Sequence, residues 1–144
     1  MKTTALIVSI VTLALCCLAA EPDATLPPPD ADGFVSLFNG KDLTGWAGRE
    51  NHWSVEDGAI TGITTRENPA KGNNFLIARD GDKNLIVDDF EIRFSYKFSS
   101  SSGNSGLQYR SKDRGSFVVN GYQGDFEVGT TYSGILYEEG GRGI

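Results

Sequence analysis

Two short stretches of the chain carry polar side chains at alternating positions. Gln108 and Arg110 are separated by one residue, and Gln123, Asp125 and Glu127 follow the same spacing. Residues two apart in a strand point to the same face, so each set would line one face of a sheet. Amide, guanidinium and carboxylate groups can make paired hydrogen bonds to neighbouring hydroxyls. The pattern therefore predicts a carbohydrate site, although an ordinary solvated outer face fits it as well.

Aromatic residues beside these stretches could complete such a site. Tyr109, Tyr122 and Trp46 each offer a flat apolar ring with a polar edge, which suits stacking on the face of a sugar. Together with Gln108 and Gln123, they are the predicted substrate-binding residues.

Other chemistries find little support in the sequence. A lone histidine, His52, cannot build a histidine metal site by itself and is interpreted as a surface or strand-end residue. The acidic run from Asp80 to Glu91 has the spacing of a calcium loop, but Leu85 stands where the loop requires glycine. We interpret this run as a solvated turn, and we expect no metal and no cofactor. A net charge of −6 without a basic patch argues against nucleic acid as a partner.

The strongest structural pattern is the strict alternation from Phe90 to Phe98. Five large side chains at the even positions alternate with polar ones at the odd positions. Period two predicts a long strand with one face on a core.

Shorter strands and turns fill the rest of the chain. Asn39-Gly40, Asp57-Gly58 and Asn120-Gly121 are turn signals. The strands that we expect lie at 53–56, 59–63, 75–77, 107–110, 117–119, 122–128 and 132–137, with a loop over 64–74. Many short strands without a helix predict an all-β fold, an antiparallel β-sandwich or jelly roll.

The N-terminus predicts export. Residues 1–20 combine a basic start, an apolar run and small residues before a polar break, as a secretory signal peptide does. Residues 21–32 contain four prolines and are predicted to form an extended tether. Both cysteines, Cys16 and Cys17, lie in the predicted leader; a minority alternative is a lipid anchor on one of them, although Leu15 is bulky for such a signal. We expect a periplasmic or extracellular protein.

The remaining residues, 33–144, predict one domain. The sequence stops after Glu139-Gly140-Gly141 within what resembles a loop, and a two-sheet sandwich would be left with an unpaired edge. We therefore expect a domain that is truncated at its C-terminus.

Four ordered motifs resemble the 3-keto-disaccharide hydrolase domain family. They are Phe34–Trp46, Trp53–Ile60, Asp89–Phe94 with Gly103–Arg110, and Gly121–Asp125 with Gly134–Tyr137. The resemblance covers nearly everything after the tether. It implies a jelly roll of the concanavalin-A-like lectin and glucanase type. It also implies hydrolysis of glycosides that are already oxidised at C3. In the commoner family pattern, the sequence Glu-x-Gln follows a Gly-Tyr pair, which here is Gly121-Tyr122. In this chain Gln123 and Asp125 occupy the positions of the Glu and the Gln.

This activity suggests roles for the polar residues. A ketone at C3 acidifies the C2 proton, so a base can remove it while the C1 substituent leaves, and water then adds to the enone. The hypothesis assigns the base to Asp125 or Glu138 and stabilisation of the enolate to Arg110, with Gln108 and Gln123 binding hydroxyls. A direct mechanism with two carboxylates is an alternative. A non-catalytic carbohydrate-binding module on the same fold is the alternative function, and a structural or adhesion domain is a third.

Overall fold

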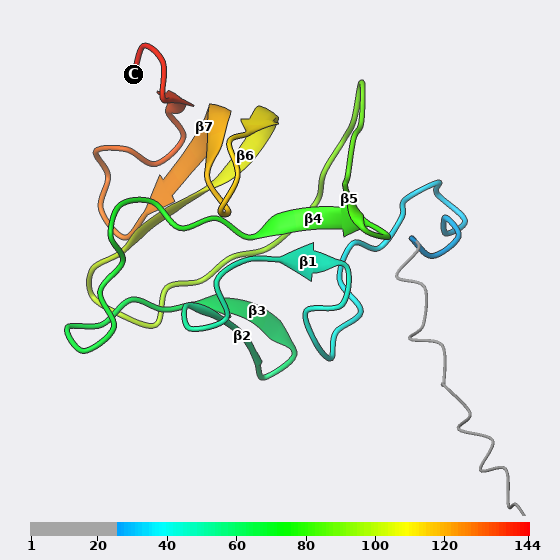
Figure 1. Ribbon diagram of the computed structural model, residues 1–144, viewed down its shortest axis with the longest axis horizontal. Helices are drawn as coiled ribbons and strands as arrows, with labels where there is room; N and C mark the ends of the chain where they lie inside the picture. Colours follow the sequence, from blue (N-terminus) through cyan, green and yellow to red (C-terminus); the bar gives the residue numbers. More distant parts are fainter. Residues whose placement is uncertain (1–25) are drawn as a thin grey trace, which may run out of the picture.

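The computed structural model describes residues 26–144, which form eight strands, all paired antiparallel (Figure 1). The strands are β1 (Trp46–Ala47), β2 (Trp53–Glu56), β3 (Ala59–Gly62), β4 (Ile77–Asp80), β5 (Lys83–Asn84), β6 (Asn104–Asp113), β7 (Val119–Glu127) and β8 (Leu136–Glu139). Within residues 26–144 no helix occurs, and so none could cross a membrane. The predicted leader and the first residues of the predicted tether lie outside the described residues.

The strands form three antiparallel groups with the orders β1-β4-β5, β2-β3 and β6-β7-β8. In Figure 1, β6 and β7 lie apart from the strands β1 to β4. The all-β fold of the sandwich or jelly-roll class is thus confirmed. With ten and nine residues, β6 and β7 are the longest of the described strands.

The hairpin of β2 and β3 confirms the turn predicted at Asp57-Gly58. Trp53 pairs with Gly62 at one end, and Glu56 pairs with Ala59 next to the turn. Both turn residues have positive φ, 51° at Asp57 and 72° at Gly58. A two-residue turn with positive φ at both positions matches the twist of the flanking strands, and it favours Asp-Gly.

The turn predicted at Asn120-Gly121 is wrong. Both residues lie inside β7, where Asn120 pairs with Lys112. The chain reverses earlier, where Arg114 N donates to Val118 O over 2.8 Å and Asp113 Oδ1 accepts from Gly115 N over 2.7 Å. The chain therefore turns at Asp113 and Gly115 of the preceding loop and not at the Asn-Gly pair. The two strands predicted at 117–119 and 122–128 are therefore one.

Smaller differences concern strand ends. The loop over 64–74 contains no strand, as predicted. The strand expected at 75–77 begins only at Ile77, and the one expected at 132–137 runs from Leu136 to Glu139. Asn39-Gly40 is a turn in which the Asn39 side chain accepts from the backbone N–H groups of Lys41 and Asp42.

The long strand predicted from Phe90 to Phe98 is also wrong as a strand. This segment is extended, but none of the described strands pairs with its backbone. Three of its even-numbered aromatic residues contact Phe126 of β7: the ring centroid of Tyr96 lies 4.2 Å from that of Phe126, and those of Phe94 and Phe98 lie 6.0 and 6.3 Å away. The fourth, Phe90, contacts Tyr109 of β6 instead. Alternation predicted the side that packs, but it carries no information about a hydrogen-bonded neighbour.

The core is thin. Val119, 6% exposed, is the one hydrophobic residue classed as buried among the described residues, and Phe94 and Tyr96 are more than half exposed. Apolar burial contributes roughly 25 cal/mol per Å² to stability, so the described residues gain little stabilisation from burial.

Candidate functional site

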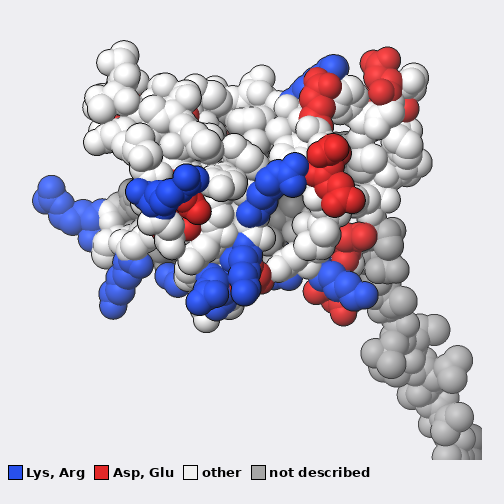
Figure 2. Space-filling model, turned by 90° about the horizontal axis from the view of Figure 1, so that it is seen from above, with Lys and Arg blue, Asp and Glu red and all other residues white. Residues whose placement is uncertain are grey.

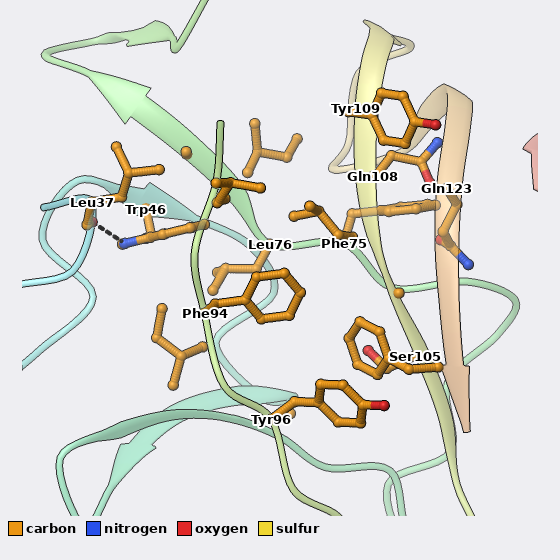
Figure 3. A pocket seen from close by; sticks show the side chains of 18 of the residues that line it. Leu37, Trp46, Phe75, Leu76, Phe94, Tyr96, Ser105, Gln108, Tyr109 and Gln123 are labelled. Atoms are coloured by element: carbon orange, nitrogen blue, oxygen red, sulfur yellow. Dashed lines mark hydrogen bonds between the residues drawn. The ribbon is translucent and has the colours of Figure 1, made fainter. Parts of the chain in front are cut away.

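A row of polar side chains crosses the sheet of β6, β7 and β8. Gln108 pairs with Gln123, which in turn pairs with Tyr137 of β8. Directly paired residues share a face, so these three side chains lie next to one another on one side of the sheet. The structure therefore brings Gln108 and Gln123 together, as Figure 3 shows, and it adds Tyr137, which the sequence analysis did not include.

Asp125 belongs to the same face. It stands two residues after Gln123 on β7, and Gln123 Nε2 donates a hydrogen bond to Asp125 Oδ1. Its partner on β6 is Gly106, which has no side chain. The carboxylate therefore lies beside an amide with no side chain opposite it.

Gln108 has the most unusual environment of the row. Both its amide atoms, Nε2 and Oε1, are buried and have no hydrogen-bond partner among the described residues. Buried polar groups are normally paired, and leaving one unpaired costs about 1–3 kcal/mol. Gln108 is thus a donor and an acceptor that a ligand could satisfy.

These residues line a large hollow. Its volume is about 3160 Å³, well above the roughly 300–1,000 Å³ of ordinary ligand pockets, so it is an open interior and not a closed pocket. Phe94 and Tyr96 project from the extended segment toward β6 and β7 in Figure 3, and Trp46 lies on the far side of that segment from the glutamines. Trp46 Nε1 donates to Leu37 O over 2.7 Å, which fixes its ring.

Arg110 lines the same hollow from an irregular position. A β-bulge interrupts the pairing of β6 and β7 after Tyr109, and Arg110 has a φ of 47°. The prediction that Gln108 and Arg110 share a face assumed strict alternation, which this bulge interrupts. The guanidinium contacts Asp89 at 3.5 Å, and both side chains are well exposed.

Tyr122 and Glu138 lie on the opposite face of the sheet from Asp125. Tyr109 pairs with Tyr122, but it also lines the large hollow beside Gln108, as Figure 3 shows. The rings of Tyr109 and Tyr122 lie 6.2 Å apart, and Glu138 pairs with Tyr122 across β7 and β8. Arg142 Nε donates to Glu138 Oε2 over 2.6 Å, and this bond lowers the pKa of Glu138 below its usual value. Tyr122 and Glu138 line a separate cavity of about 210 Å³. The structure therefore does not bring Glu138 together with Asp125.

His52 is buried and has a structural environment. It is 6% exposed, and its Nδ1 lies 3.1 Å from Ile63 O at the end of the β2–β3 hairpin. The strand-end position agrees with the sequence, but the residue does not lie at the surface.

Charged side chains separate on the face shown in Figure 2, where most Lys and Arg lie toward the left and most Asp and Glu toward the right. In residues 26–144 no group of three or more His, Cys, Asp or Glu side chains could hold a metal ion.

Comparison with known proteins identifies the family. Residues 33–143 match the sequence model of the 3-keto-alpha-glucoside-1,2-lyase-like domain. A protein of Bacteroides thetaiotaomicron named 3-keto-disaccharide hydrolase is 33% identical over 105 residues, which are 66% of this chain and 33% of that protein. The chain thus spans about a third of the length of this relative. No solved structure matches. The chain belongs to the 3-keto-alpha-glucoside-1,2-lyase-like family, which confirms the resemblance read from the four motifs.

Proposed function

We propose, on the premise of this family membership, that the protein cleaves glycosidic bonds of 3-keto-glycosides. The observation that carries the proposal is the face formed by Gln108, Gln123 and Asp125, where the carboxylate accepts from the Gln123 amide and the Gln108 residue lies next to Gln123. The relative named 3-keto-disaccharide hydrolase supports the same chemistry. The predicted leader in residues 1–20 supports a reaction outside the cytoplasm as part of this proposal.

In this proposal Asp125 is the base. A ketone at C3 of the sugar makes the proton at C2 acidic, so the carboxylate takes that proton while the electron pair forms the enolate. The C3 carbonyl then re-forms as a double bond forms between C1 and C2, the C1–O bond breaks, and the leaving oxygen takes a proton from water, which yields an enone. Addition of water to the enone completes the hydrolysis.

Arg110 stabilises the enolate, and Gln108 binds the sugar. The contact between Arg110 and Asp89 joins exposed groups at 3.5 Å, and such a pair contributes about 0–1 kcal/mol, so the guanidinium can turn to the enolate oxygen at little cost. The unpaired amide of Gln108 binds a sugar hydroxyl, since a hydroxyl can both donate and accept.

The test compares turnover of 3-keto-trehalose and plain trehalose by the purified protein and by Asp125→Asn. We expect glucose release from the keto-sugar alone, and a loss of at least ~10²-fold in kcat for the variant because general bases contribute about that much. Asp82→Asn, an exposed residue of the β4–β5 turn, is the matched control and should behave as wild type.

Retained activity in Asp125→Asn would remove Asp125 from the base role. Binding of unoxidised glycan without any turnover would instead favour a carbohydrate-binding module.

A further inference from the structure

We infer that Gly106 and Gln123 form a positioning pair that holds the carboxylate of Asp125 in one direction. The inference rests on the proposed function, because it concerns the residue proposed as the base. Neither Gly106 nor Gln123 needs to touch the reacting atoms through this role.

The first part of the pair is the bond from Gln123 to Asp125. The two residues stand two apart on β7, and Gln123 Nε2 donates to Asp125 Oδ1. An ionised carboxylate only accepts hydrogen bonds, so the NH₂ end of the amide must face it. The bond occupies Oδ1 and thereby fixes the direction of Oδ2, the second oxygen of the carboxylate.

The second part is the space above Gly106. Gly106 is paired with Asp125, and the Gln123 side chain passes over it on the way to that carboxylate. A Cβ added at Gly106 would lie 2.5 Å from Gln123 Cγ, 2.6 Å from its Cδ and 2.8 Å from its Nε2. Any side chain at this position therefore pushes the amide from its path.

The backbone does not require glycine at position 106. Gly106 is absent from the glycines with positive φ, so an L-residue could adopt its conformation. The glycine is needed because it leaves room for one particular side chain.

Gly124 provides a matched control on the neighbouring strand. It too lies inside a regular strand without positive φ, and it is paired with Leu107 on the opposite face of the sheet. A Cβ added at Gly124 meets nothing within 4 Å. Both positions thus face the same glycine-to-alanine change in a strand, but only Gly106→Ala displaces Gln123.

The test is a double-mutant cycle on the purified protein with Gly106→Ala, Gln123→Ala and the double variant, beside Gly124→Ala. We expect Gly106→Ala to lower kcat about 10- to 100-fold with little change in KM, because a base displaced by about 1 Å loses up to ~10² in rate. In the Gln123→Ala background the same change should cost less than about twofold, since the side chain that it displaces is gone. Gly124→Ala should stay within about twofold of wild type.

Two results overturn the inference: a kcat of Gly106→Ala equal to that of Gly124→Ala, or an equal cost of Gly106→Ala with and without Gln123. If wild type turns over no keto-sugar, the proposed function fails and the pair is decided by NMR. Gln108 and Gln123 are the only glutamines of the chain, so the side-chain NH₂ signals of Gln123 can be assigned. These signals should move in Gly106→Ala and stay in Gly124→Ala; signals that do not move in Gly106→Ala refute the pair.

Discussion

Replacing Gln108 with methionine should make the protein more stable and a poorer binder. Methionine has nearly the same length and is apolar, so it removes a buried donor and a buried acceptor that have no partners among the described residues. When a buried polar group is unpaired, its desolvation is not compensated. The free protein should therefore gain stability from the substitution that costs it a contact to substrate.

The magnitude follows from the two amide atoms. An unpaired buried polar group costs about 1–3 kcal/mol, so relief of this cost should raise the free energy of unfolding by a similar amount. For domains of roughly 60–250 residues, each kcal/mol corresponds to about 2–8 °C in Tm. Loss of one or two hydrogen bonds to a sugar, each about 0.5–1.5 kcal/mol, should weaken binding by roughly 2- to 150-fold.

The assay has two arms. Thermal unfolding without ligand gives the change in Tm, and calorimetric titration with 3-keto-trehalose in the Asp125→Asn background gives Kd without turnover. Lys112→Met, an exposed change further along β6, is the control and should change neither value by more than the roughly 0.5 kcal/mol of surface substitutions. A lower Tm together with an unchanged Kd for Gln108→Met would refute the reasoning, because the amide would then have partners within the protein.

Two further predictions concern the turns at Asn39-Gly40 and Asp57-Gly58. The Asn39 side chain, which donates to Asp42 Oδ1 over 2.7 Å, and then Thr44 lower the pKa of Asp42 to about 2 from 3.8. Because the pKa of Asp42 is lower in the folded than in the unfolded state, its ionised carboxylate stabilises the folded state at a pH above the unfolded pKa. This stabilisation is lost as the pH falls from about 4 to about 2. Asn39→Ala should therefore raise the pKa of Asp42 in an NMR titration and weaken this acid dependence; an unchanged midpoint would contradict the assignment. Gly58→Ala should lower the free energy of unfolding by about 1–2 kcal/mol, because its φ of 72° is left-handed. Equal Tm values for Gly58→Ala and the strand control Gly124→Ala would show that the turn tolerates a side chain.

The two turn signals show which local patterns could be predicted. Asp57-Gly58 succeeds because the residues on both sides alternate and pair with each other, so neighbours in sequence are neighbours in space. Asn120-Gly121 fails because its strand pairs with a segment that ends at Asp113, and the loop between them already supplies the reversal. A turn signal is decisive only when no nearby segment offers a better turn.

The candidate site, too, could be predicted only where its residues are close in sequence. The shared face of Gln123 and Asp125 follows from their spacing on one strand, and the structure agrees. Tyr137 and Gly106 join them through the register with β8 and β6, and register between separate segments is not encoded in the spacing of either one. The sequence pattern likewise did not predict the bulge at Arg110, since the bulge depends on how β7 pairs with β6.

The two faces of the sheet differ in a way that bears on the mechanism. Mechanisms with two carboxylates need the two acids in one cleft, flanking the scissile bond at about 5–10 Å from each other. Asp125 and Glu138 project from opposite faces, and Glu138 is already bonded to a guanidinium. Asp125 is bonded to a neutral amide, which orients a carboxylate without neutralising its charge. A single oriented base next to a substrate whose C2 proton is acidic is what elimination requires, and this is why we favour elimination over direct displacement.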